Sequence, residues 1–250
     1  MLPILLFIND KPSNIKNILA NKNCIVSKFS DSDSNIYQIC IDKEPINWLI
    51  KVYNDEKYAK REANILSELE SIEGIPRLFA FGTSSLFSYI ILSKIEGREL
   101  FRYKGKLNEE DLKNVSRQLL TILKKVHSKN IVHRDIKPEN IIYNENTKKV
   151  SLIDFEQKTT DGFECPEFFD NKKNSDPKTK WDIWSFGITI YETYFKVIPF
   201  KNTNEILNNT LTFKSKISDD FSSFLECALE KDENKRYSAI QLLNHAWLIK

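Results

Sequence analysis

Short hydrophobic runs separated by polar stretches dominate the first part of the chain. Runs rich in β-branched and aromatic residues, bounded by polar turns, are typical of strands. The pattern predicts strands at 24–29, 36–40, 48–53, 78–82 and 89–92. Between them, apolar residues recur at helical spacing from Ala59 to Leu69 and predict a helix over 58–72.

Helical spacing dominates the rest of the chain. Asn108 precedes three acidic residues at 109–111 and can cap a helix, whose positively polarised start favours acidic side chains. Apolar positions over 112–126 then form one continuous buried face. A shorter helix is predicted from Ser13 to Asn21. The second part of the chain is therefore predicted to be mainly helical.

A polar stretch at 133–140 lies between two short apolar runs, at 131–132 and 141–143. Each run predicts a short buried strand. The loop between the two strands would then hold three polar side chains in fixed relative positions: Asp135, Lys137 and Asn140.

Composition narrows the class of protein. The chain has 250 residues, 41% hydrophobic and 29% charged, which is globular, and its net charge of +2 implies no general attraction to nucleic acid or to a membrane surface. Four cysteines without metal-ligand spacing indicate a reducing compartment rather than a disulfide scaffold. We interpret the apolar stretch Met1 to Ile8 as a strand or packed arm rather than a targeting segment. No other apolar run is long enough to span a membrane, so we expect a soluble intracellular protein.

The motif His-Arg-Asp-Ile-Lys-Pro-Glu-Asn at 133–140 resembles the catalytic loop of eukaryotic-type serine/threonine protein kinases. Further motifs of the family occur in the family's order, and the resemblance covers about residues 24 to 248. They are Lys51 in the third strand, Asp154-Phe155-Glu156 after a strand at 150–153, Pro166-Glu167, Trp181 to Gly187, and Arg236. The resemblance implies an α+β, bilobal protein kinase fold, as one domain over residues 1–250. Its small antiparallel β-rich N-lobe, with a C helix and a short N-terminal extension, would cover 1–95, and its larger α-helical C-lobe 96–250.

The same resemblance implies the catalytic and metal-binding residues. Asp135 would orient the substrate hydroxyl, and Lys137 would contact the γ-phosphate of ATP. Asn140 and Asp154 would bind Mg²⁺, or Mn²⁺ in its place, since hard cations prefer oxygen ligands. His133 would be a packed structural residue rather than an acid or base.

Lys51 would contact the α- and β-phosphates. An isolated buried ammonium group is costly, so Lys51 needs a counter-charge. Glu62 in the predicted helix is the best candidate, and Glu56 and Glu68 fit the pattern less well.

The nucleotide contacts implied by the resemblance come from several segments. Leu92 would be the gatekeeper, and the backbone of Ser93 and Ile95 would contact the adenine edge. Glu99 would contact the ribose or a basic substrate residue, although a surface role without ligand fits it equally. The complete set of expected nucleotide-binding residues is Lys51, Ile36, Leu92, Ser93, Ile95, Glu99, Asn140 and Asp154.

Three more roles follow from the matched motifs. Asp182 would hold the backbone of the catalytic loop, and Arg236 would form a buried ion pair with Glu167. Thr160 and Phe163 occupy the positions of the threonine and tyrosine in the substrate-docking loop of the family.

Two departures from the family pattern concern the nucleotide and the metal. The turn at 30–35, which is glycine-rich in the family, contains no glycine, so we expect weaker nucleotide affinity or, alternatively, an ordinary hairpin turn. Glu156 replaces the usual glycine after Asp154-Phe155, which could restrict a flipped inactive conformation, alter metal preference or abolish catalysis.

The activation loop is also very short, because little chain separates Glu156 from Thr160. Phosphorylation would have few residues to rearrange in such a short segment, so we expect activity that does not depend on it, that is, constitutive activity.

The function implied is an ATP-dependent serine/threonine protein kinase acting on a protein substrate. Acidic Glu99 and Glu139 would favour basic residues near the acceptor hydroxyl. The alternative is a pseudokinase scaffold or nucleotide-binding module without turnover, and a kinase for small molecules is disfavoured by the docking segment 160–167. The compact length also resembles kinases of large DNA viruses, such as those of baculoviruses. We expect no direct binding to nucleic acid or membrane.

Overall fold

The computed structural model describes residues 24–29, 35–83, 87–169 and 178–250. The chain divides into two compact units. Unit 1 consists of residues 1–71 and 75–95, and unit 2 of residues 72–74 and 96–250. The arm at 1–8, the helix at 13–21 and most of the turn at 30–35, all predicted from the sequence, lie outside the described residues.

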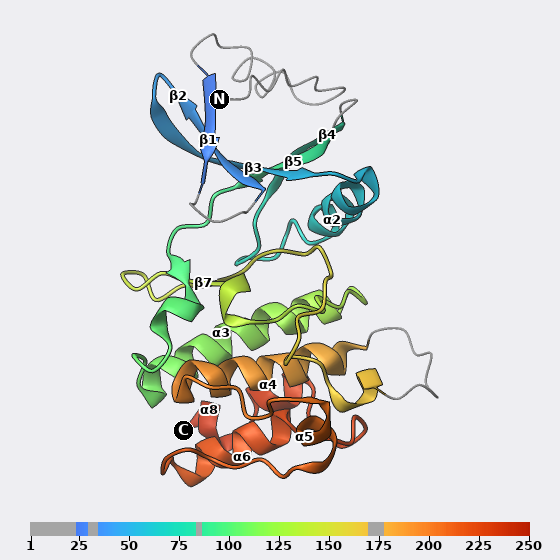
Figure 1. Cartoon of the computed structure of the whole chain (residues 1–250). Coiled ribbons are helices and arrows are strands. Elements are labelled where there is room, and N and C mark those ends of the chain that lie inside the picture. The colour runs from blue at the N-terminus through green and yellow to red at the C-terminus, as the bar shows by residue number, and fades with distance from the viewer. Residues whose placement is uncertain (1–23, 30–34, 84–86, 170–177) are drawn as a thin grey trace. The chain divides into compact units, whose positions relative to one another are not determined.

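The described part of unit 1 contains a five-stranded antiparallel sheet in the order β1-β2-β3-β5-β4 (Figure 1). Its strands are β1 (Cys24–Lys28), β2 (Ile36–Ile41), β3 (Glu44–Tyr53), β4 (Leu78–Thr83) and β5 (Ser88–Ser93). Every strand predicted for this part of the chain is present, but β3 begins at Glu44 rather than Trp48. Asp42 and Lys43 adopt φ angles of 52° and 72°, so a tight turn lets β3 start pairing with β2 at once.

The two faces of this sheet serve different purposes. One face carries a hydrophobic cluster of buried side chains: Ile39, Ile50, Ala80, Tyr89 and Ile91. Because neighbouring residues of a strand face opposite sides, Lys51 points away from Ile50 and its cluster. Helix α2 (Glu56–Glu68) packs on β3, β4 and β5 and supplies the partner of Lys51.

Helix α2 is shorter than the helix predicted over 58–72. Its first turn is capped by Asp55, whose carboxylate accepts a hydrogen bond from the Lys57 amide at 2.8 Å. The helix ends at Glu68. Ile72, which the apolar pattern assigned to the helix, is buried in a turn before Gly74, whose φ of 90° is incompatible with a helix.

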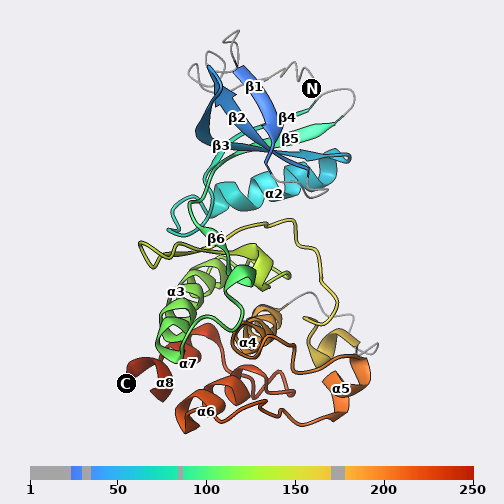
Figure 2. The same cartoon turned by 60° about the vertical axis from the view of Figure 1, so that its left-hand side comes forward.

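Unit 2 is mainly helical, as predicted. Its helices are α3 (Glu109–His127), α4 (Thr179–Phe195), α5 (Thr203–Asn208), α6 (Asp219–Ala228), α7 (Ala239–Leu243) and α8 (Ala246–Ile249), with 3-10 helices η1 (Leu100–Tyr103), η2 (Pro138–Asn140) and η3 (Pro166–Phe169). Helix α4 is central and is seen nearly end-on in Figure 2, with other helices around it. It is apolar on nearly all sides, as expected of a buried helix, and Trp184, Phe186, Ile188 and Ile190 are fully buried.

A small antiparallel sheet β6-β7-β8 also belongs to unit 2, formed by β6 (Arg98–Glu99), β7 (Ile141–Tyr143) and β8 (Val150–Leu152). The strand predicted at 141–143 is present, and the one predicted at 150–153 forms over 150–152. The strand predicted at 131–132 is wrong. Ile131 and Val132 are buried, but the chain then turns at Arg134, with φ 73°, and the amides that follow bond to a side chain of α4 instead of a strand.

The end of the chain contains two short helices, whereas the sequence after Tyr237 predicts a single helix that ends at 245–247. Helix α7 stops at Leu243 and α8 begins at Ala246. His245 makes this break, because its Nδ1 accepts a hydrogen bond from the Trp247 amide at 3.2 Å and caps the new helix.

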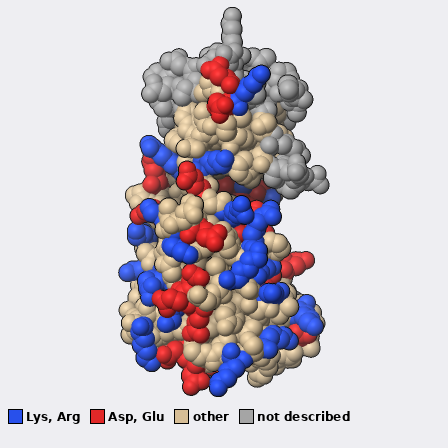
Figure 3. Space-filling view, turned by 90° about the vertical axis from the view of Figure 1, so that its left-hand side faces the viewer, with Lys and Arg blue, Asp and Glu red and all other residues tan. Residues whose placement is uncertain are grey.

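Surface charge and cysteine placement agree with the composition. Basic and acidic side chains are interspersed over the face of unit 2 seen in Figure 3. No helix among the described residues is long and apolar enough to cross a bilayer. Cys40 in unit 1 and Cys165 in unit 2 are buried free thiols, and burial raises the pKa of the Cys165 thiol.

Candidate active site

A buried ion pair lies in unit 1. The Lys51 ammonium on β3 is 2.8 Å from Oε2 of Glu62 on α2, and both side chains are almost fully buried. The Tyr53 hydroxyl donates to the same carboxylate oxygen at 2.5 Å. Because two charges are expensive to bury without close partners, this pairing fixes α2 against the sheet. The counter-charge predicted for Lys51 is confirmed.

Two of the expected nucleotide-binding residues lie near the ion pair in the same sheet. Ile36 on β2 pairs with Lys51 on β3, and Leu92 on β5 pairs with Leu49, two residues before Lys51. The Ser93 amide donates to the Arg77 carbonyl at 2.9 Å, so this amide is not available to a ligand. The Ile95 amide donates to no described residue, which suits a backbone donor for a ligand.

Asp182 on α4 organises the loop that precedes β7. Its carboxylate accepts hydrogen bonds from the His133 and Arg134 amides, each at 2.8 Å, and lies 2.8 Å from Nε2 of His127 on α3. Burial alone would raise the pKa of Asp182, but the hydrogen bond from His127 and the His133 amide lower it overall. A fully buried carboxylate therefore stays ionised and holds the loop, as predicted.

Asp135 is the centre of a polar network within this loop. Its Oδ1 accepts a hydrogen bond from the Thr160 hydroxyl at 2.6 Å, and its Oδ2 lies 3.1 Å from the Lys137 ammonium. The Asn140 amide donates to Oδ2 and to the Asp135 carbonyl, both at 2.9 Å. Lys137 also donates to Thr160 at 2.7 Å. Three side chains separated in sequence, those of Lys137, Asn140 and Thr160, thus fix one buried carboxylate.

Thr160 was expected in the substrate-docking loop, but its direct bond to Asp135 could not be predicted. No local pattern connects 135 with 160, since the contact depends on how the segment folds back. Glu99, by contrast, is exposed on β6 and joins none of these contacts, and its expected role stays a prediction.

His133 is completely buried and structural, as predicted. Its Nδ1 accepts from the Asp135 amide at 3.2 Å, and its Nε2 donates to the Ile153 carbonyl at 3.0 Å. The ring also meets the Phe155 ring edge to face, with centroids 4.6 Å apart. This histidine therefore joins the Asp135 loop to the segment that contains Asp154.

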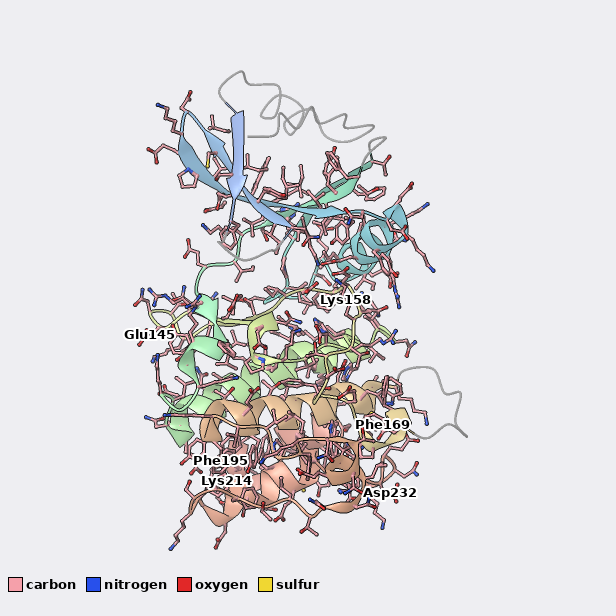
Figure 4. All side chains as sticks on the ribbon, in the orientation of Figure 1. Glu145, Lys158, Phe169, Phe195, Lys214 and Asp232 are labelled. Atoms are coloured by element: carbon pink, nitrogen blue, oxygen red, sulfur yellow. The ribbon has the colours of Figure 1, made fainter. Side chains whose placement is uncertain are left out.

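The turn at 154–158 follows β8 and holds the expected metal ligand Asp154. Asp154 and Gln157 adopt left-handed φ angles of 66° and 60°, which costs about 1–2 kcal/mol for each non-glycine residue. Glu156 is not among the described residues with positive φ, so its side chain is tolerated where the family pattern has glycine. Its carboxylate is 2.8 Å from the ammonium of Lys158, which is labelled in Figure 4.

The segment after Thr160 ends in a second buried ion pair. Arg236 donates to both oxygens of Glu167, at 2.6 and 2.9 Å, and this predicted pair is confirmed. Burial alone would raise the pKa of Glu167, but Arg236 lowers it overall.

Comparison with known proteins agrees with this geometry. Residues 34–248 match the family model described as protein kinase domain. The chain belongs to the protein kinase family. Its resemblance to that family, first suggested by the motif at 133–140, is thus confirmed.

Several curated kinases are similar to this kinase domain. Serine/threonine-protein kinase ppk25 of Schizosaccharomyces pombe is 31% identical over 65% of the chain and 43% of its own length. Calcium-dependent protein kinase 6 of Plasmodium berghei is 30% identical over 93% of the chain and 19% of its own length. Mitogen-activated protein kinase kinase 7 of Arabidopsis thaliana is 33% identical over 64% of the chain and 60% of its own length. The chain thus spans less than two thirds of the length of each of these relatives.

A solved structure shows the same fold. The structure titled Crystal structure of Rad53 kinase domain and SCD2 aligns with a TM-score of 0.74 and 23% identity, over 92% of this chain and 90% of that chain. The predicted kinase fold is confirmed. None of the three curated relatives named above is viral, and the likeness to kinases of large DNA viruses finds no support among them.

The kinase family generally uses ATP and a divalent metal, and the residues present fit both. Asn140 uses its side-chain nitrogen Nδ2 to bond Asp135, and among the described residues none donates a hydrogen bond to its side-chain oxygen Oδ1. This oxygen and the Asp154 carboxylate are the hard donors that Mg²⁺ prefers. In unit 1, the buried Lys51 ammonium and the Ile95 amide provide donors suited to a nucleotide.

Proposed function

We propose that this kinase domain transfers the γ-phosphate of ATP to a serine or threonine hydroxyl of a protein substrate. The observation that carries the proposal is the polar network of Asp135, Lys137, Asn140 and Thr160. It supplies a fixed carboxylate and a lysine side by side, which is the arrangement that aligns a hydroxyl for phosphoryl transfer.

Each residue of the network has a distinct task. Asp135 accepts the hydrogen bond of the substrate hydroxyl and orients its oxygen, while Thr160 and Asn140 keep the carboxylate from rotating. Lys137 places a positive charge where negative charge develops during transfer. Mg²⁺ and ATP, when bound, supply the phosphoryl group and neutralise its charge. We propose Asn140 and Asp154 as the metal ligands and Lys51 as the phosphate contact, with Glu62 orienting Lys51.

Two finer properties belong to the same proposal. Glu99 is exposed and Glu139 is half-buried in η2, so basic residues beside the acceptor hydroxyl would find opposite charge. Thr160 is already bonded to Asp135 and Lys137 without any phosphate, which supports activity that needs no phosphorylation of the segment 156–160.

A pseudokinase remains the second candidate, because the turn at 30–35 contains no glycine to approach nucleotide phosphates. The turn at 154–158 holds Glu156 without positive φ, so a non-glycine residue at this position causes no backbone strain of its own, which supports turnover.

The test is transfer of labelled phosphate from ATP to peptides with Mg²⁺ or Mn²⁺. Wild-type protein treated with a phosphatase should label lysine- and arginine-rich serine peptides faster than acidic ones. Asp135→Asn should reduce the rate about 10²- to 10⁴-fold, because the carboxylate that orients the hydroxyl is lost. Glu139→Gln, which keeps the network, serves as the matched control and should alter only the preference for basic peptides.

If the wild-type protein labels peptides no faster than Asp135→Asn does, the result would favour the pseudokinase. Dependence on prior phosphorylation of residues 156–160 would contradict constitutive activity, and preference for acidic peptides would contradict the substrate proposal.

A further inference from the structure

The turn at 154–158 is held in an unfavourable backbone conformation, in part by residues that lie outside the matched kinase motifs or depart from them. Asp154 and Gln157, both non-glycine, have left-handed φ on either side of Phe155 and Glu156. Such a conformation persists only where surrounding contacts determine it. Three sets of contacts do so here.

The first contact crosses from the turn to the Asp135 loop. The Gln157 side-chain amide donates to the Val132 carbonyl at 2.8 Å. Val132 directly precedes His133, whose amide is bound by the buried Asp182 carboxylate. Gln157 is therefore attached to backbone that the buried Asp182 carboxylate holds in place.

The second contact closes the turn on itself. The Glu156 carboxylate, only 10% exposed, is 2.8 Å from the Lys158 ammonium, which is 64% exposed. The ion pair spans Gln157, whose backbone it holds from both sides. A glutamate also has fewer accessible backbone conformations than the glycine of the family pattern, so competing conformations of the turn are fewer.

The third set of contacts fixes the other end of the turn. The Ile153 amide donates to the Asn140 carbonyl at 2.9 Å, and the Ile153 carbonyl accepts from His133 at 3.0 Å. Phe155 is fully buried against the His133 ring. Asp154 thus lies directly between the anchored residues Ile153 and Phe155, and the Gln157 contact follows two residues after Phe155.

We propose that Gln157 and the Glu156–Lys158 ion pair are positioning residues that hold Asp154 ready for the metal before any ligand binds. The proposal rests on the proposed function, in which Asp154 binds the metal of the nucleotide. The replacement of glycine by Glu156 then stabilises the competent turn and compensates for the absence of a long activation segment.

Hydrogen exchange of the ligand-free protein, followed by mass spectrometry of peptides covering 152–160, tests directly whether these contacts hold the turn. Gln157→Met keeps the side-chain volume but removes the donor, and should speed exchange there roughly 3- to 10-fold, the size of one hydrogen bond. Glu156→Gly should speed it at least as much, because it removes the ion pair and frees the backbone.

The matched control is Tyr191→Phe. The Tyr191 hydroxyl on α4 likewise donates to a backbone carbonyl, that of Thr212 at 2.7 Å, and neither residue takes part in the three sets of contacts that hold the turn. This variant should lower the melting temperature while leaving exchange at 152–160 unchanged. Equal acceleration of these peptides by Tyr191→Phe and Gln157→Met would show a general loss of stability and overturn the proposal, as would unchanged exchange in Gln157→Met.

Binding of ADP provides a second readout that does not need turnover. Gln157→Met should weaken binding of Mg²⁺-ADP roughly 3- to 10-fold, because fewer molecules hold Asp154 in place, and should leave binding of ADP in a chelator unchanged. Equal weakening under both conditions would contradict a role through the metal ligand. If the variants show these changes in exchange and binding but the wild-type protein transfers no phosphate, the proposed function is overturned. The proposed positioning of Asp154 would still hold.

Discussion

Arg236 and Glu167 show how strongly single residues can determine the stability of unit 2. The guanidinium is 1% exposed and donates to both oxygens of a carboxylate that is itself buried. Arg236 also donates to the carbonyls of Lys180 and Glu230, and its guanidinium lies 5.1 Å from the centre of the Trp184 ring. The pair therefore joins η3 to α4 and to the turn before α7.

Arg236→Met should reduce the free energy of unfolding by about 3–5 kcal/mol, because it leaves the Glu167 charge buried without its partner. Urea unfolding followed by circular dichroism measures the loss. Lys235→Met, at the neighbouring and 75% exposed side chain, is the control and should change stability by less than about 0.5 kcal/mol. Similar losses in the two variants would show that the buried pair has no special contribution.

At the scale of elements, close packing of α4 decides which residues it can carry. Gly187 lies in the middle of this helix, where alanine would normally be favoured by about 1 kcal/mol. A Cβ added there would lie 2.7 Å from Cδ2 and 2.8 Å from Cγ of the buried Leu229. Overpacking of this kind costs about 1–3 kcal/mol and outweighs the gain in helix propensity.

Gly187→Ala should therefore destabilise the wild-type protein by about 1–2 kcal/mol. In a Leu229→Ala background the clash with Leu229 is removed and only the milder approach to the Ala228 Cβ, at 3.1 Å, is left, so the same substitution should stabilise by up to about 1 kcal/mol. Chemical denaturation of the four proteins of this cycle measures the interaction. The same sign in both backgrounds would show that Leu229 is not what excludes a side chain at 187.

Elements whose sequence signals are local could be predicted well. The strands of unit 1, the Asn108 cap of α3 and the Lys51–Glu62 pair follow from runs of β-branched and aromatic residues, capping chemistry and the cost of a buried charge. Two features could not be predicted: the absence of a strand at 131–132 and the break between α7 and α8. Both depend on side chains, those of Asp182 and His245, that bond to backbone amides. Gln157 gave no signal at all, since an amide side chain in a polar turn has no distinctive pattern.

For the candidate site, the resemblance to kinases identified the residues, and the structure added how they are held. The motif at 133–140 gave Asp135, Lys137 and Asn140, but not the Thr160 hydroxyl that completes the network. Contacts between distant segments determine the orientation of each group, and such contacts are not encoded in local spacing.

At the scale of the whole molecule, unit 2 depends on carboxylates that are buried and ionised. Asp182 and Glu167 both have pKa values below the ordinary value of their residue types, because hydrogen bonds from His127 and Arg236 outweigh burial. A carboxylate with a lowered folded-state pKa contributes stability above its unfolded-state pKa. That contribution is lost as the pH falls through the folded-state value.

We therefore expect unfolding in acid to begin as the pH falls below about 4 and to become complete at lower pH. Far-ultraviolet circular dichroism from pH 7 to pH 2 measures it. The double variant Asp182→Asn, Glu167→Gln should be less stable at pH 7 and show a flatter acid dependence, whereas Glu110→Gln, at an exposed side chain, should match the wild type. An unchanged slope in the double variant would contradict the assignment.

The distribution of buried thiols makes opening of the two units separately measurable. Cys40 lies in β2 of unit 1 and Cys165 lies just before η3 of unit 2, and alkylating reagents reach neither in the folded protein. If Cys24 and Cys227 are replaced by serine, each unit retains one protected thiol. Timed alkylation followed by peptide mass spectrometry then gives one opening rate for each unit from the same sample. Nucleotide could be added to such an experiment to determine which unit it protects.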